Sequence, residues 1–235
     1  MELTMIKTIL WDVDGTLLDF HAAQKAAIRS LFKDFSLCEL SDEMIEHYSH
    51  INDIFWERLE RNEISKQEVL VGRFEQFFEE IGVDKTIAAE FNDRYQLRLG
   101  DTIVYRDDSY EIVKSLKNKV KQYVVSNGTI VSQTKKLKMS GFDQLMDGIF
   151  LSEAIGIEKP NMGFFDAVFN ELENKDPKEI MIVGDSLTSD IQGGINAGLV
   201  TCWYNPNRKE KPDKYQIDYI IDDLHEVYDL LDKNN

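Results

Sequence analysis

Short apolar runs alternate with amphipathic segments along much of this chain, and that alternation limits its possible folds more than any other feature. The chain has 235 residues, and after Asp101 brief β-branched runs are separated by segments whose apolar residues recur at helical spacing. Brief runs of this kind are typical of buried strands. Strands that are regularly separated by helices form a parallel sheet covered on both faces. The pattern therefore predicts an α/β fold with a doubly wound parallel sheet.

The expected elements can be placed by residue number. Strands are expected at 5–11, 121–126, 148–151, 180–184, 199–204 and 219–221, and helices at 130–139, 164–172, 191–197 and 224–231. Such a core is Rossmann-like, and sheets of this kind bind ligands beyond the carboxyl ends of their strands. We therefore look for chemistry in the turns that follow the predicted strands.

One long segment interrupts the alternation. Between about residues 19 and 99 the apolar residues recur only at helical spacing, as in Ile51, Phe55 and Leu59. We therefore expect a core made of residues 1–18 and 100–235, and an inserted all-helical cap subdomain at 19–99. Two connections would join the cap to the core, which permits gating.

The net charge narrows the choice of partners. The chain carries a formal charge of −16 at pH 7. A chain this acidic would be repelled by polymeric nucleic acids and by anionic membrane surfaces, because binding either of them requires clustered Lys and Arg. Neither is therefore an expected partner. A small anionic substrate would have to be held by a local positive site, such as a bound cation, a lysine or a helix N-terminus.

Cysteine usage and hydropathy suggest a cellular compartment. Cys38 and Cys202 are far apart and form no CxxC pattern, and the N-terminus does not resemble a secretory signal. No apolar stretch reaches the roughly 18 residues that a membrane-spanning helix needs. We expect a reduced, cytoplasmic protein, either a monomer or a homodimer.

An acidic turn follows the first predicted strand. Asp12 and Asp14 lie two positions apart, so both carboxylates could reach the same side of the turn. Gly15, which follows them, gives the backbone the freedom that such a turn needs. Paired carboxylates at this spacing suit a metal and a nucleophile. A calcium loop is excluded, because Thr16 and Leu17 stand at its third-ligand and glycine positions and Ala23 stands where its bidentate Glu belongs. A simple solvated turn stays open on this motif alone.

Three further segments carry polar groups: the turns that end two of the expected strands, and a loop that follows a strand and precedes a helix. Ser126 and Asn127 offer a hydroxyl and a backbone N–H, although Ser-Asn-Gly is also ordinary turn chemistry. Lys159 could meet a phosphate as a point charge, although a single loop lysine is commonly solvated. Asp185 and Asp190 flank a polar stretch that could equally cap a helix.

Taken in chain order, these residues resemble the four motifs of the haloacid dehalogenase-like hydrolase superfamily. The motifs are Asp12-x-Asp14-Gly15-Thr16, Ser126-Asn127, Lys159, and Gly184-Asp185 with Asp190. The resemblance covers essentially the whole chain. The helical segment between the first and second motifs resembles the small helical cap of that superfamily.

The resemblance implies a phosphomonoester hydrolase that works through a phospho-aspartate. Asp12 would be the nucleophile, and Asp14 would protonate the leaving alcohol and later accept a proton from water. Ser126 and the Asn127 N–H would hold phosphoryl oxygens, and Lys159 would offset their charge. The implied cofactor is Mg²⁺. Its implied ligands are the Asp12 carboxylate, the Asp14 backbone carbonyl and Asp185, with Asp190 in support.

Asp14 also separates reaction classes within the superfamily. In the superfamily that this chain resembles, the dehalogenases have no metal and no carboxylate two positions after the nucleophile. The presence of Asp14 here therefore favours phosphoryl transfer to water. A sugar-phosphate phosphatase or phosphomutase stays open as an alternative. So does a non-catalytic binding member, although intact acids at all four motifs favour an enzyme.

The substrate is expected to be a small phosphorylated metabolite. Leu17-Leu18-Asp19-Phe20 resembles a segment of the nucleoside 5′-monophosphate phosphatases, which implies a 5′-nucleotidase. Aromatic residues of the cap could stack on a base or could simply fill its core; they are Phe20, Phe55, Trp56, Phe74, Phe77 and Phe78. Glu43, His47 and His50 share a helical face, which we interpret as solvated because no third strong ligand lies nearby.

Overall fold

A computed structural model describes residues 5–233 of the chain. The chain divides into two compact units. The first, here the α/β unit, consists of Met1–Asp19 together with Val104–Asn235, and the second, the helical unit, consists of Phe20–Ile103. Across residues 5–233, none of the helices combines the length and the apolar character that crossing a membrane requires.

The α/β unit is built on one parallel sheet. Its strands are β1 (Thr8–Trp11), β2 (Lys121–Ser126), β3 (Gly148–Leu151), β4 (Ile180–Gly184), β5 (Val200–Tyr204) and β6 (Tyr219–Ile221). They lie in the order β3-β2-β1-β4-β5-β6, and every neighbouring pair is parallel. This arrangement confirms the predicted doubly wound α/β fold. The order reverses at β1, so β1 lies between β2 and β4.

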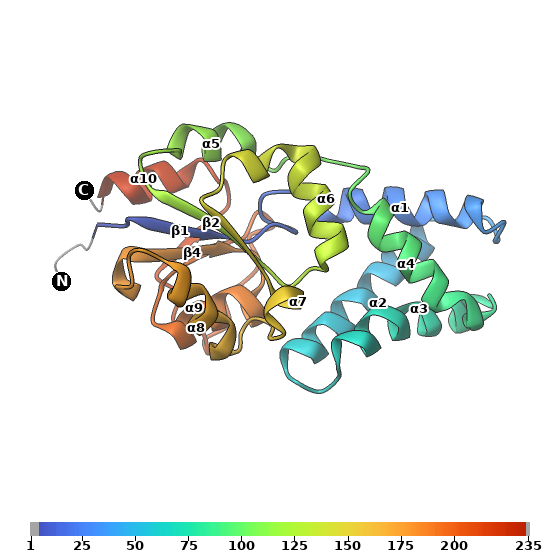
Figure 1. Cartoon of the computed structure of the whole chain (residues 1–235). Coiled ribbons are helices and arrows are strands. Elements are labelled where there is room, and N and C mark those ends of the chain that lie inside the picture. The colour runs from blue at the N-terminus through green and yellow to red at the C-terminus, as the bar shows by residue number, and fades with distance from the viewer. Residues whose placement is uncertain (1–4, 234–235) are drawn as a thin grey trace. The chain divides into compact units, whose positions relative to one another are not determined.

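Helices cover both faces of this sheet. They are α5 (Ser109–Leu116), α6 (Ile130–Ser140), α7 (Ser152–Ile155), α8 (Met162–Glu171), α9 (Gln192–Ala197) and α10 (Glu226–Lys233). Short helical turns lie at η2 (Phe142–Gln144), η3 (Pro177–Glu179) and η4 (Leu187–Ile191), and η4 is a π-helix. Figure 1 shows α5 and α10 over one face and α8 and α9 over the other.

Alternate strand residues fill the space between the sheet and α8. Leu10, Val125 and Ile182 are fully buried and pack in one cluster with Phe164 and Phe165 of α8. Burying side chains of this size contributes about 1.5–3 kcal/mol each. The strands that carry the polar turns are therefore anchored by a well-filled core.

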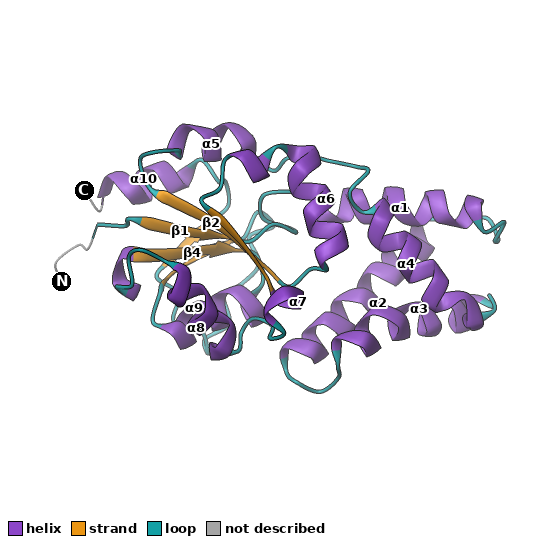
Figure 2. Cartoon of the chain, in the orientation of Figure 1, coloured by secondary structure: helices purple, strands orange, loops and turns teal. Residues whose placement is uncertain are grey.

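The helical unit consists of four main helices. Figure 2 draws these helices in purple. They are α1 (Phe20–Asp34), α2 (Asp42–Glu60), α3 (Lys66–Ile81) and α4 (Ala88–Arg98), with a short turn at η1 (Lys85–Ile87). Ser41 and Ser65 cap the first turns of α2 and α3 through their hydroxyls, and Ser65 forms a capping box with Glu68.

Aromatic residues form the centre of the helical unit. Phe74, Phe77 and Phe78 are fully buried there, so these three rings cannot stack on a nucleotide base. Phe20 and Trp56 are only partly buried against the same core. His47 pairs with Glu80, and this exposed pair is part of the solvated face of α2.

Candidate active site

The turn after β1 is shaped by a glycine in a left-handed conformation. Gly15 has φ = +96°, and its N–H bonds to the carbonyl of Leu18 at 2.9 Å. A Cβ at Gly15 would lie 2.4 Å from Oδ2 of Asp185, so no larger residue fits without moving that carboxylate. The turn thus brings the acids that follow β1 against the end of β4.

Asp12 lies in the centre of this turn and bonds to a buried lysine. Only 7% of Asp12 is exposed, and its N–H continues the ladder to Val183 at 3.0 Å. Lys159 donates to Oδ1 of Asp12 at 2.9 Å. Burial raises the pKa of Asp12 above its ordinary value, the Asp190 and Asp185 charges add to the rise, and the Lys159 ammonium opposes it.

Lys159 is held by three oxygen atoms. Its ammonium also donates to the Val125 carbonyl at 2.8 Å and to Oδ1 of Asp190 at 2.6 Å. Burial alone would lower the pKa of Lys159, but the neighbouring Asp12 and Asp190 charges raise it above the ordinary value. Lys159 therefore stays cationic at neutral pH.

Asn127 positions the Lys159 backbone. Its side-chain amide donates to the Lys159 carbonyl at 2.9 Å, and its Oδ1 accepts from the Lys159 N–H at 2.8 Å. The sequence predicts a phosphate contact from the Asn127 backbone N–H and gives no indication of this role of its side chain. Ser126 ends β2, and its Oγ accepts from the Gly128 N–H at 3.0 Å.

Asp185 follows β4 and faces the turn of β1. Thr16 donates to its Oδ1 at 3.3 Å, and the Trp203 indole donates to its backbone carbonyl at 2.9 Å. The residue as a whole is exposed to solvent, but Gly15 and Thr16 crowd its carboxylate. Desolvation of that carboxylate, together with the Asp190 charge, raises the pKa of Asp185 to about 7.

Asp190 lies in the π-helix η4, whose geometry the sequence pattern did not predict. Only 1% of Asp190 is exposed, and its Oδ2 accepts from the Ser186 N–H at 3.1 Å. A Cβ at Gly184 would lie 2.3 Å from the Asp190 carboxyl carbon. Gly184 therefore leaves the space that this buried carboxylate occupies.

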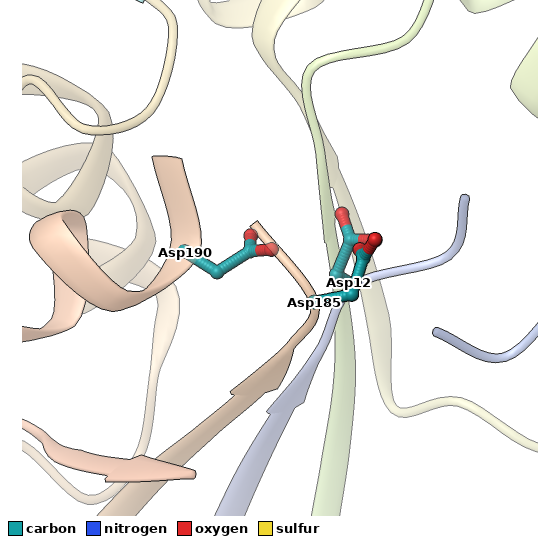
Figure 3. Close-up of side chains that lie close together, drawn as sticks. All are labelled: Asp12, Asp185 and Asp190. Carbon is teal, nitrogen blue, oxygen red and sulfur yellow. The ribbon is translucent and has the colours of Figure 1, made fainter. Parts of the chain in front are cut away.

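Asp12, Asp185 and Asp190 form the one group of metal-compatible side chains found among residues 5–233. Each offers an oxygen, and these oxygens lie within 4.8 Å of one another. Figure 3 shows Asp190 pointing from its helical turn toward the other two. When ionised, the three carboxylates share one ammonium, so a divalent cation would balance their charge. Oxygen-only ligands suit Mg²⁺.

Asp14 is not part of this group. Its Oδ2 accepts from Nε2 of Gln133 at 2.5 Å, and its Oδ1 accepts from Nζ of Lys136 at 2.5 Å. Both partners belong to α6, which follows β2. Gln133 and Lys136 are not among the site residues predicted from the sequence, although their i, i+3 spacing on a helix that follows Ser126-Asn127 is a usable signal.

The structure thus brings the predicted residues to one edge of the sheet. Asp12 and Asp14 follow β1, Ser126 ends β2 and Asn127 follows it, and Asp185 follows β4. Lys159 and Asp190 join Asp12 in one hydrogen-bonded group, and Asn127 holds the backbone of Lys159. A carboxylate beside a fixed ammonium and two further acids is an arrangement suited to attack on an anionic, electrophilic centre.

Comparison with known proteins gives a family and several similar chains. The family model described as haloacid dehalogenase-like hydrolase matches residues 6–198. The chain is 34% identical to the HAD-hydrolase YfnB of Bacillus subtilis over 97% of each chain. It is 33% identical to the pyrimidine 5′-nucleotidase PynA of Streptococcus pneumoniae, over 97% of this chain and 96% of PynA.

Two further matches extend the comparison. The pyrimidine 5′-nucleotidase YjjG of Escherichia coli is 27% identical over 96% of this chain and 98% of YjjG. The solved structure of YfnB bound to magnesium has a TM-score of 0.90 and covers 97% of this chain and 99% of that one.

Proposed function

This chain belongs to the haloacid dehalogenase-like hydrolase family, and from that membership and the geometry of its site we propose that it is a Mg²⁺-dependent phosphomonoester hydrolase acting through a phospho-aspartate on Asp12. The observation that carries the proposal is the contact of Asp12 with the buried ammonium of Lys159. This contact keeps the nucleophile beside a fixed positive charge at the ligand-binding edge of the sheet.

The first step transfers the phosphoryl group to the enzyme. An oxygen of the Asp12 carboxylate forms a bond to phosphorus while the bond from phosphorus to the leaving alcohol breaks. Asp14 gives its proton to the departing oxygen. Ser126 and the Asn127 N–H hold phosphoryl oxygens, so that the attacking and leaving oxygens lie in line.

The second step returns the nucleophile. Water attacks the phosphorus of the phospho-aspartate, the bond to the Asp12 oxygen breaks, and inorganic phosphate leaves. Asp14, now a carboxylate, accepts a proton from the attacking water. The same side chain therefore serves as acid and then as base, which restores the starting state.

The charges of the substrate explain why the site needs positive groups. At ~4 Å and an effective dielectric constant near 20, each repulsion between unit charges costs about 4 kcal/mol. Lys159 offsets part of this cost. Mg²⁺, when held by Asp12, Asp185 and the Asp14 backbone carbonyl with Asp190 in support, supplies two further positive charges.

The proposed substrates are nucleoside 5′-monophosphates, and pyrimidine nucleotides in particular. Two similar proteins over nearly the full length, PynA and YjjG, are named as pyrimidine 5′-nucleotidases. Sugar phosphates remain the alternative substrate class. Both cysteines are free, Cys38 exposed and Cys202 buried, which fits the proposed cytoplasmic location.

A phosphate-release panel tests this proposal. It compares pyrimidine and purine 5′-monophosphates with sugar phosphates, each with Mg²⁺ and with a chelator. We expect the highest kcat/KM for pyrimidine nucleotides with Mg²⁺, and loss of several orders of magnitude in Asp12→Asn. The exposed Asp166 of α8 supplies a matched control, Asp166→Asn, which should retain full activity. Equal turnover by Asp12→Asn and the wild type would refute the mechanism.

A further inference from the structure

The carboxylate of Asp14 is fixed at both of its oxygens. Gln133 donates to one oxygen and Lys136 to the other, each at 2.5 Å. Two donors on different oxygens prevent rotation of the carboxylate plane, and hydrogen bonds that involve charged groups are the stronger kind. Asp14 therefore has a defined orientation, which a residue that transfers protons requires.

Both donors are buried and come from one face of α6. Gln133 is fully buried and Lys136 is 1% exposed. A buried lysine is rare unless it has a partner, and Asp14 is the carboxylate it pairs with. A Cβ at Gly128 would lie 2.4 Å from Nε2 of Gln133, so this glycine leaves room for the Gln133 side chain.

Asp14 itself stays accessible. Its side chain is 24% exposed, whereas that of Lys136 is 2% exposed. Each carboxylate oxygen has a second acceptor position, so the two bonds to α6 leave Asp14 able to meet a substrate oxygen. Its partners follow β2, on one side of β1, whereas Asp185 and Asp190 follow β4 on the other side.

We propose that Gln133 and Lys136 are positioning residues that hold Asp14 for proton transfer to the leaving oxygen. This inference rests on the proposed function. When Asp14 donates its proton in the first step, it becomes a carboxylate at the same moment. The Lys136 ammonium and the Gln133 amide stabilise that carboxylate because they already contact both oxygens.

The dependence on the leaving group distinguishes this role from a structural one. A nucleotide loses an alkoxide, which needs a proton, whereas p-nitrophenyl phosphate loses a stable phenolate, which does not. The ratio of kcat/KM for uridine 5′-monophosphate to kcat/KM for p-nitrophenyl phosphate therefore reports proton donation. Because kcat/KM reflects steps only up to departure of the alcohol, the later role of Asp14 as base does not enter.

The experiment measures this ratio in Asp14→Ala, Gln133→Met and Lys136→Met. We expect Lys136→Met to lower kcat/KM for the nucleotide by about 100-fold and for the aryl phosphate by less than about tenfold. Gln133→Met should change the ratio in the same direction and keeps the test valid if Lys136→Met does not fold. The control is Lys138→Met, an exposed charge on the same helix, which should leave the ratio unchanged.

A double variant shows whether Lys136 acts through Asp14. Asp14→Ala with Lys136→Met should have the ratio of Asp14→Ala alone, because the effects of coupled residues are not additive. If Gln133→Met or Lys136→Met folds and lowers kcat/KM for both substrates by the same factor, the inference is overturned while the proposed function stays intact. Absence of turnover in the wild type on both substrates overturns the proposed function and this inference with it.

Discussion

Nζ of Lys159 lies 2.9 Å from Oδ1 of Asp12, although the two residues are 147 positions apart in the chain. The topology explains this contact, because β1 is the central strand and the loop before α8 returns to the same sheet edge. The Val125 carbonyl and Asp190 hold the same ammonium. The Lys159 side chain therefore connects its own loop to the turn after β1, to β2 and to η4.

Lys159→Met should destabilise the protein. It leaves Asp12 and Asp190 buried without their shared cation, and breaking a buried ion pair in this way costs about 3–5 kcal/mol. Urea unfolding with a chelator and with Mg²⁺ measures the loss, which should be smaller with Mg²⁺. The exposed Lys138→Met is the control. An equal loss with and without the cation would contradict a common site for Lys159 and Mg²⁺.

Mg²⁺ should stabilise the protein more at high pH than at low pH. Without metal, the pKa of Asp185 is raised to about 7, so the folded state favours its protonated form. The stability from this group is full below the ordinary pKa of an Asp and is lost as the pH rises through about 7. Mg²⁺ held by the ionised form would compensate for that loss.

Thermal unfolding with and without Mg²⁺ tests this pH dependence. Between about pH 8 and about pH 6, competition from the proton should weaken Mg²⁺ binding by up to about tenfold. The rise in Tm on adding Mg²⁺ should fall accordingly. An identical rise at both pH values would show that Asp185 is not a ligand.

Gly15→Ala should impair metal binding beyond its effect on the backbone. Its methyl group would lie 2.4 Å from the Asp185 carboxylate, which must then move. Gly156→Ala is a matched control, because Gly156 also has a positive φ, +84°, and nothing lies within 4 Å of its added Cβ. The positive φ should cost each variant about 1 kcal/mol of stability. Only Gly15→Ala should weaken Mg²⁺ binding in calorimetric titrations.

Arg73→Lys should destabilise the helical unit. Arg73 is buried, and its guanidinium donates to Asn52 at 2.7 Å and to Asn92 at 3.2 Å. One ammonium cannot reproduce this fork, so we expect a loss of about 3 kcal/mol in urea unfolding. Arg94→Lys, an exposed control on α4, should cost little. If Arg73→Lys left the free energy of unfolding unchanged, the two amide contacts would not stabilise the unit.

The sheet was predictable because its strands are continuously apolar and end in polar turns. Five of the six expected strands agree with the structure to within one residue at each end, whereas β1 begins later than its apolar run. Helix α5 was missed, although its buried residues Ile112, Val113 and Leu116 recur at helical spacing. The π-helix η4 was also missed, because its geometry depends on tertiary contacts such as the ion pair of Asp190 with Lys159.

The sequence indicated most residues of the candidate site, but it did not indicate which side chains contact one another. Strand-end turns indicated Asp12 and Asp185, because parallel strands bring such turns to one edge. Lys159 lies in the loop between α7 and α8, and the family motif indicated it. The side-chain bonds of Asn127 to Lys159, and of Gln133 and Lys136 to Asp14, depend on packing between segments. Sequence spacing alone contains no information on those distances.

The most direct test of the central claim is to trap the phosphoryl-enzyme. The protein is mixed with a nucleoside 5′-monophosphate and Mg²⁺, quenched in acid within the first turnover, and digested for peptide mass spectrometry. The account predicts a phosphoryl group on Asp12, absent when Mg²⁺ is chelated and absent in Asp12→Asn. Phosphate release without any phosphoryl group on Asp12, or with the group on another residue, would contradict it.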